Sequence, residues 1–154
     1  MLPKVYIETS FVSYLTARPS RDLVIAGHQE STREWWETCR ARFELYTSQI
    51  VVEEAKAGDV SAAEERVDVL ATTTLLAVTP EAFSLAEKLV QSLAVPVKAS
   101  VDALHIGIAA FHSVDYLLTW NCKHLANAML RTSIELVCRQ NGFRAQLSAR
   151  RSSC

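Results

Sequence analysis

The chain has 154 residues, of which 49% are hydrophobic and 21% charged, and its formal net charge is −1. A chain of this length is typical of one domain, which buries roughly 70% of the surface that the unfolded chain exposes. The composition argues against a disordered or fibrous protein. The near-neutral charge argues against a protein that coats DNA through a general basic field, although it is compatible with an enzyme that holds a nucleic acid over a small basic rim.

The cysteine spacing and the N-terminus bear on the cellular compartment. The four cysteines (Cys39, Cys122, Cys138 and Cys154) are irregularly spaced and form no C-x-x-C pair, which does not favour a zinc or redox motif. We expect them to be reduced thiols. The sequence from Met1 leads directly into a strand-like segment without a signal peptide, and it contains no apolar stretch of about 18 residues. These features predict a cytoplasmic protein with no membrane association.

Short apolar strands alternate with helical patterns in the first part of the chain. Strands are predicted over residues 5–7, 45–47 and 75–78. A helix capped by Ser10 is predicted to stop before Pro19, and Ser48 is predicted to cap a helix that Gly58 closes. Further helices are predicted over residues 61–71 and from Pro80 onward, where proline suits the first helical position.

A long amphipathic pattern lies between the first two strands, from Asp22 to Glu44. It predicts one long helix or two packed ones. Its apolar stripe includes Trp35, Trp36 and Cys39, and we interpret this stripe as core or as a dimer surface.

The segment from Ser100 to Leu125 is the one around which the other elements are arranged. Its first half has apolar residues at helical spacing, and Ser100 is a plausible N-cap. The helical period breaks at residues 113–115. Residues 116–118 then form a short apolar strand of the kind that is buried on both faces of a parallel sheet. A second helix is predicted from Asn121 to Leu130.

The remaining residues complete the expected fold. A last strand is predicted over residues 134–138, and residues 142–154 are predicted to form a loosely structured, weakly basic tail after a domain of residues 1–141. Strands that alternate with helices imply right-handed crossovers between parallel strands. The predicted fold class is therefore α/β: a three-layer α/β/α sandwich with a mainly parallel sheet of about five short strands.

Oxygen-bearing side chains follow several of the predicted strands, at the edge where ligands bind in open α/β sheets. Glu8 follows the first strand, Glu53 and Glu54 lie early in the helix after the second, and Asn121 follows the strand at 116–118. Asp102 opens the helix before that strand. Each residue also has an ordinary explanation: a polar turn for Glu8, a solvated helix face for Glu53 and Glu54, the helix dipole for Asp102 and a helix cap for Asn121.

Carboxylates that lie close together repel one another unless a cation neutralises them. A set of oxygen ligands without histidine or cysteine suits Mg²⁺ or Mn²⁺. Such an ion polarises a phosphoryl oxygen and lowers the pKa of a bound water. The edge therefore predicts cleavage of a phosphodiester with water as the nucleophile.

Four segments resemble, in order, the signature blocks of PIN-domain ribonucleases, many of which are the toxins of VapBC-type toxin–antitoxin pairs. The segments are residues 6–10 (YIETS), 48–54 (SQIVVEE), 102–106 (DALHI) and 118–121 (LTWN). The resemblance covers about residues 4 to 138. It implies a PIN-like fold and a metal-dependent endoribonuclease that is inhibited by a cognate antitoxin and, as is usual in the family, dimeric.

The resemblance also assigns the site residues. Glu8 occupies the place of the family's first acid, normally an aspartate. The second acid falls on Glu53 or Glu54, of which we favour Glu54, and the third is Asp102. Asn121 occupies a fourth position that is often an aspartate. Glu8, Glu54 and Asp102 are then the expected ligands of Mg²⁺ or Mn²⁺, and with only three carboxylates one ion is favoured over two.

The expected reaction is the cleavage of single-stranded or loop RNA, with Asn121 completing the site. Thr9, Ser10 or Thr119 would position the phosphate or the acids, and Lys98 and Lys123 would contact the RNA backbone. For His105 and His124 we favour a packed, hydrogen-bonded role over contact with the phosphate or proton transfer. Two alternatives stay open: a catalytically weak or inactive PIN-like module that binds RNA or an antitoxin, and a metal-dependent phosphatase.

Overall fold

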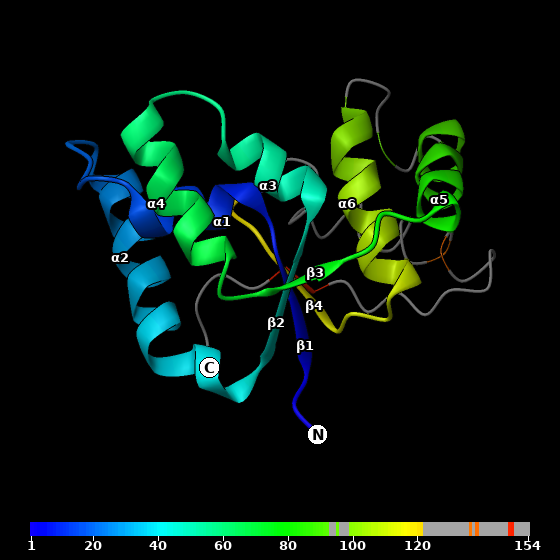
Figure 1. Cartoon of the computed structure of the whole chain (residues 1–154), viewed down its shortest axis with the longest axis horizontal. Coiled ribbons are helices and arrows are strands. Elements are labelled where there is room, and N and C mark those ends of the chain that lie inside the picture. Colours follow the sequence, from blue (N-terminus) through cyan, green and yellow to red (C-terminus); the bar gives the residue numbers. More distant parts are fainter. Residues whose placement is uncertain (93–94, 96–98, 122–135, 137, 139–147, 150–154) are drawn as a thin grey trace.

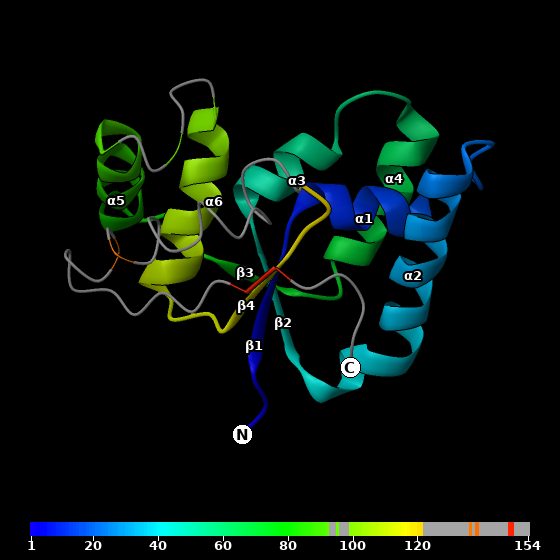
Figure 2. The same cartoon turned by 180° about the vertical axis from the view of Figure 1, so that it is seen from behind.

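A parallel β-sheet runs through the centre of the molecule, and helices cover both of its faces (Figures 1 and 2). The computed structural model describes residues 1–92, 95, 99–121, 136, 138 and 148–149. The predicted three-layer α/β/α architecture is confirmed. None of the helices in these residues is long and apolar enough to cross a membrane.

The sheet has the strand order β3-β2-β1-β4-β5, and every neighbouring pair is parallel. The strands predicted at residues 5–7, 45–47, 75–78 and 116–118 are present, with small differences at their ends. Because all the strands run in one direction, their carboxyl ends meet at one edge. The strands are β1 (Lys4–Ile7), β2 (Glu44–Ser48), β3 (Thr74–Leu76), β4 (Tyr116–Leu118) and β5 (Ser148–Ala149).

The helices begin where the sequence provides side chains that accept hydrogen bonds from free backbone amides. Asp22 caps α2 through the amides of Val24 and Ile25, and Thr79 caps α5 just before Pro80. A short 3₁₀ turn, η1 (Arg40–Arg42), follows α2. The helices are α1 (Thr9–Thr16), α2 (Leu23–Cys39), α3 (Gln49–Ala55), α4 (Val60–Leu70), α5 (Pro80–Gln91) and α6 (Ser100–Phe111).

The alternation of side chains along β1 divides the core into two parts. Val5 and Ile7 belong to a cluster that includes residues of α1 and α2, whereas Tyr6 belongs to a larger cluster with residues of α5 and α6. Figures 1 and 2 show these two pairs of helices on opposite sides of the sheet. All three β1 side chains are almost fully buried, as expected for a central strand of a parallel sheet.

Helices α5 and α6 lie so close together that one residue at their contact must be glycine. A Cβ atom on Gly107 would lie 2.5 Å from the backbone oxygen of Ala82 in α5. This close approach holds α6, which carries Asp102, firmly against its neighbour.

Several sequence predictions are wrong in detail. Glu8, not Ser10, is the N-cap of α1, because the Glu8 carboxylate accepts the Ser10 amide. Ala99, not Ser100, precedes α6. The strand predicted over residues 134–138 is wrong where it is described, since Leu136 and Cys138 are helical. A short apolar run does not distinguish a strand from a buried helix.

The fifth strand lies instead at residues 148–149, inside the range predicted to be a loose tail, where it pairs with β4. The helix predicted from Asn121 to Leu130 lies outside the described residues apart from its first residue. The division into residues 1–141 and 142–154 stays a prediction.

The stripe of α2 packs against the core, with Trp36 only partly buried, and its use as a dimer surface stays a prediction. Trp35 and Cys39 are each 2% exposed and pack in the cluster with Val5 and Ile7. Cys39 is disulfide-bonded, which contradicts the expected reduced state for this residue. Cys138 is buried and forms no disulfide bond.

Candidate functional site

Glu8 lies where β1 ends and α1 begins, and its carboxylate is held by neutral donors. It accepts hydrogen bonds from the Ser10 amide at 3.1 Å and from the hydroxyls of Ser10 and Thr119, each at 2.5 Å. Thr119 is adjacent because β4 pairs with β1, so that the two strands end side by side. Glu8 is only 6% exposed, and within the described part of the chain no lysine or arginine forms an ion pair with it.

Glu54 approaches the same edge from α3. Its Oε1 accepts hydrogen bonds from Thr9 Oγ1 at 2.6 Å and from His105 Nε2 at 3.0 Å. Partial burial raises the pKa of the Glu54 carboxyl, but these two hydrogen bonds and the electrostatic attraction of the neighbouring His105 outweigh burial and lower the pKa below its usual value. Glu54 is therefore ionised at neutral pH and available to a cation.

The neighbouring Glu53 points elsewhere. Its carboxylate accepts hydrogen bonds from Gln49 at 2.6 Å and from Lys56 at 3.4 Å, both on the surface of the same helical segment. These contacts lower the pKa of Glu53. Of the two adjacent acids, Glu54 is thus the one that the fold places beside Glu8.

His105 connects the site to the core through a buried chain of hydrogen bonds. Its Nδ1 lies 2.7 Å from the hydroxyl of Tyr6, which lies 2.8 Å from Ser48 Oγ. Because a carboxylate only accepts hydrogen bonds, the network assigns a hydrogen to the Nε2 that faces Glu54. Burial raises the pKa of Tyr6 strongly, so its phenol is neutral. His105, Tyr6 and Ser48 are each 0% exposed.

Asp102 and Asn121 form a second pair at this edge. The side-chain Nδ2 of Asn121 donates to Asp102 Oδ2 at 3.2 Å, and the backbone N–H of Asn121 donates to Thr119 Oγ1 at 2.9 Å. Asp102 lies in the first turn of α6, one turn before His105 on the same face of the helix. Thr119 thus touches both Glu8 and Asn121, so it joins the two pairs of predicted site residues.

One group of side chains in the described residues has the spacing of metal ligands. Glu8, Glu54 and His105 each offer an atom that lies within 4.8 Å of the other two. Asp102 is not a member of this group. Two of the three predicted carboxylate ligands, Glu8 and Glu54, thus lie together with His105, and Asp102 lies at the same edge beside Asn121.

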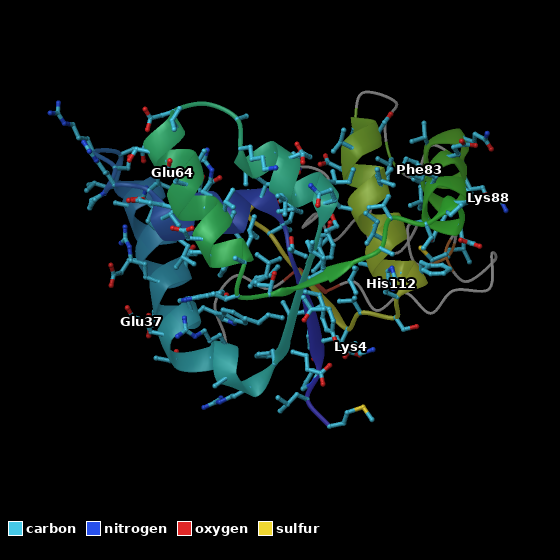
Figure 3. All side chains as sticks on the ribbon, viewed as in Figure 1. Lys4, Glu37, Glu64, Phe83, Lys88 and His112 are labelled. Atoms are coloured by element: carbon cyan, nitrogen blue, oxygen red, sulfur yellow. The ribbon has the colours of Figure 1, made fainter. Side chains whose placement is uncertain are left out.

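The residues fit a divalent cation on chemical grounds. Two carboxylates in mutual proximity favour a positive charge between them, and the donors to the buried Glu8 in the described residues are all neutral. The surface acids differ from it, as Glu37 and Glu64 point outward into solvent (Figure 3). Of these three glutamates, Glu8 alone is buried.

Sequence reasoning missed Tyr6 and Ser48 and placed His105 outside the metal site. Tyr6 lies in an apolar strand, where its ring is ordinary core, and only its hydroxyl reaches the site. The signal for His105 was its position one turn after Asp102. Lys98 and Lys123, the predicted RNA contacts, and His124 lie outside the described residues.

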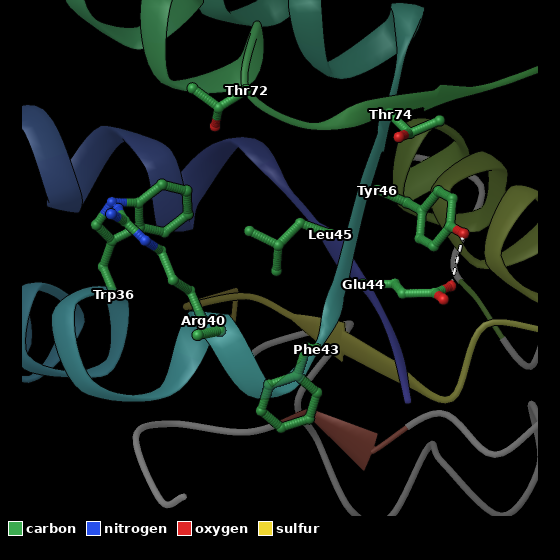
Figure 4. Close-up of a pocket in the computed structure, with 9 residues that line it drawn as sticks. Trp36, Arg40, Phe43, Glu44, Leu45, Tyr46, Thr72 and Thr74 are labelled. Carbon is green, nitrogen blue, oxygen red and sulfur yellow. Dashed lines mark hydrogen bonds between the residues drawn. The ribbon is translucent and has the colours of Figure 1, made fainter. Parts of the chain in front are cut away.

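Pockets in the described residues lie away from this site. One pocket is located at the amino end of β2, opposite to the edge that holds Glu8 (Figure 4). In it the Arg40 guanidinium lies 4.8 Å from the Trp36 ring centre, and Tyr46 donates a hydrogen bond to Glu44. The polar groups of Arg40 and Glu44 thus have partners inside the pocket. None of the residues that line the pocket belongs to the site.

The sheet order, the helices on both faces and the acids at the carboxyl edge define a PIN-like fold. No family model and no curated protein matches the sequence. Among solved structures, the chain is similar to VapC20 of Mycobacterium tuberculosis, a toxin that cleaves the sarcin-ricin loop. The two share 14% identity with a TM-score of 0.57, and the match covers 93% of this chain and 98% of VapC20. At this identity the likeness concerns the fold.

Proposed function

We propose that this protein is a metal-dependent endoribonuclease and the toxin of a toxin–antitoxin pair. The observation that carries the proposal is the convergence of Glu8 and Glu54, which are 46 positions apart in the sequence, within 4.8 Å at the carboxyl edge of the sheet. In the part of the chain that the structure describes, the buried Glu8 carboxylate has neutral donors, and such a charge is costly to bury unless it serves to bind a cation.

The residues divide into ion-holding and positioning groups. Glu8, Glu54 and Asp102 hold Mg²⁺ or Mn²⁺, the first two directly. Thr9 fixes the Glu54 carboxylate, while Ser10 and Thr119 fix that of Glu8. Asn121 orients Asp102 through its amide. When bound, the ion neutralises charge on the scissile phosphate and acidifies a water for attack.

The substrate proposed is single-stranded or loop RNA. The similar structure, VapC20, is a toxin that cleaves the sarcin-ricin loop, which favours RNA over small phosphate esters. In this proposal the shape of the rim and its loops select the RNA target, and the acidic site acts on the phosphate.

The proposal includes a cytoplasmic protein, a cognate antitoxin and a homodimer. An adjacent gene for a short protein with a DNA-binding N-terminus is expected. Coexpression of the two chains should give a complex that co-purifies and has no ribonuclease activity. Light scattering of the isolated protein should give twice the mass of 17.1 kDa. A monomer would refute the proposed dimer and leave the proposed nuclease activity untouched.

Cleavage of total cellular RNA in the presence of Mn²⁺ tests the enzyme. Wild type should cut, and Glu54→Gln and Asp102→Ala should lose at least about tenfold in rate. Glu53→Gln is the matched control, because it alters the adjacent acid that points away from the site. Equal cutting by all proteins would indicate a contaminant and refute the assignment. RNA binding without cutting by wild type would favour a catalytically inactive module.

A further inference from the structure

We propose that His105 is itself a ligand of the metal ion, through Nε2, so that the ion is held by two carboxylates and one imidazole and Mn²⁺ is preferred over Mg²⁺. The inference rests on the proposed function and adds to it a ligand and a metal preference. The sequence predicted a purely oxygen-ligated ion at this edge.

The separations within the site carry the first step. His105 Nε2 lies 3.0 Å from Glu54 Oε1. Two adjacent ligands that are each about 2.1 Å from a shared octahedral ion lie roughly 3.0 Å apart. Glu8 completes the group within 4.8 Å of both. The imidazole nitrogen therefore already lies at ligand spacing from Glu54.

The environment of His105 carries the second step. The ring is buried, and its far nitrogen lies against the Tyr6 hydroxyl at 2.7 Å, which in turn contacts Ser48. Metal-binding histidines are usually oriented in this way, by a hydrogen bond from the nitrogen that does not bind the ion. Both hydroxyls can donate or accept. When the ion binds, the neutral ring carries its one proton on Nδ1, donated to Tyr6, and the Nε2 lone pair faces the carboxylates.

The choice of metal follows from ligand chemistry. Mg²⁺ prefers oxygen and water ligands, whereas imidazole favours transition metals. A site of two carboxylates and one imidazole should therefore bind Mn²⁺ more tightly than Mg²⁺. If His105 only positioned Glu54, replacing His105 would reduce the affinities for Mn²⁺ and Mg²⁺ by the same factor.

Electron spin-echo spectroscopy of the Mn²⁺-loaded wild-type protein tests direct ligation. Protein labelled with ¹⁵N-histidine should show a nitrogen coupling at the ion that changes from the ¹⁴N to the ¹⁵N pattern. The coupling should be lost in His105→Gln. It should persist in the matched control His112→Gln, since His112 lies at the other end of α6, where its Nε2 lies 2.8 Å from the backbone carbonyl of Ala77 (Figure 3).

A second variant keeps the test decisive if His105→Gln fails to fold. In a protein whose His28, His112 and His124 are all replaced by glutamine, His105 is the sole remaining histidine, and the nitrogen coupling should persist. Bound Mn²⁺ without a histidine coupling in wild type would overturn the proposal for His105 while leaving a metal-dependent nuclease intact.

Calorimetric titration provides the matching affinity readout. In His105→Gln the Mn²⁺ affinity should fall at least about tenfold while the Mg²⁺ affinity changes much less, so the ratio between the two ions collapses. A proportional loss of both affinities would identify His105 as a positioning residue and overturn its role as a ligand. Failure of wild type to bind either ion would refute the proposed function as well.

Discussion

The carboxylate of Glu54 shows how single contacts set the charge of the site. Burial opposes its ionisation, yet His105 and Thr9 donate to the same oxygen and reverse the balance. Its side chain is 37% exposed, so water screens part of the effect. The ionised form of Glu54 is nevertheless more stable, relative to the protonated form, in the folded protein than in the unfolded chain.

This lowered pKa predicts a pH dependence of stability. A group with a depressed folded pKa stabilises the protein above its unfolded value, here 4.5, and loses this contribution as the pH falls through the lower folded pKa. Thermal unfolding without metal should show Glu54→Gln less stable than wild type at neutral pH. The difference in stability between Glu54→Gln and wild type should narrow below pH 4.5. A gap that stays constant through this acid range would contradict the account.

Tyr6 offers a second test at the scale of single residues. Tyr6→Phe removes a hydroxyl that contacts both Ser48 and His105 in the core. Leaving a buried polar group without its hydrogen-bond partner lowers the unfolding free energy by about 1–3 kcal/mol. The matched control is Tyr46→Phe, whose hydroxyl contacts only Glu44 among the described residues and should change stability by less than about 0.5 kcal/mol. Urea denaturation measures both, and equal losses would refute the buried chain.

The packing of α5 against α6 determines where the site residues of α6 lie. Asp102 and His105 belong to this helix, and at Gly107 the helix lies too close to α5 for a Cβ atom. A helix so placed leaves little freedom for the ring of His105, which is held between β1 and α3 by Tyr6 and Glu54.

Two glycine substitutions test this contact. Gly107→Ala would place a methyl group 2.5 Å from the Ala82 backbone oxygen, and we expect a loss of about 1–3 kcal/mol in unfolding free energy. Gly27→Ala is the control, because its Cβ in α2 meets no atom within 4 Å. It should stabilise the helix by about 0.5–1 kcal/mol. Denaturation curves in which Gly107→Ala is as stable as wild type would contradict the close approach.

Much of the whole molecule follows from sequence patterns. Short apolar strands between helical periods predict a parallel sheet, and a parallel sheet brings Glu8 and Thr119 to one edge. The pattern did not predict the helical state at Leu136 and Cys138 or the pairing of residues 148–149, because short apolar runs fit either structure and edge pairing is a long-range contact. The place of His105 depends on Tyr6 and Glu54, and therefore on tertiary packing that local periodicity does not contain.

The most direct measurement is anomalous X-ray diffraction from crystals of the protein soaked in Mn²⁺. The account predicts an anomalous peak at the carboxyl edge of the sheet, in contact with the carboxylates of Glu8 and Glu54. Crystals of Glu8→Gln should lose the peak, since a neutral amide replaces a buried charge. An empty edge in wild type, or an ion bound only at another place on the molecule, would contradict the central claim.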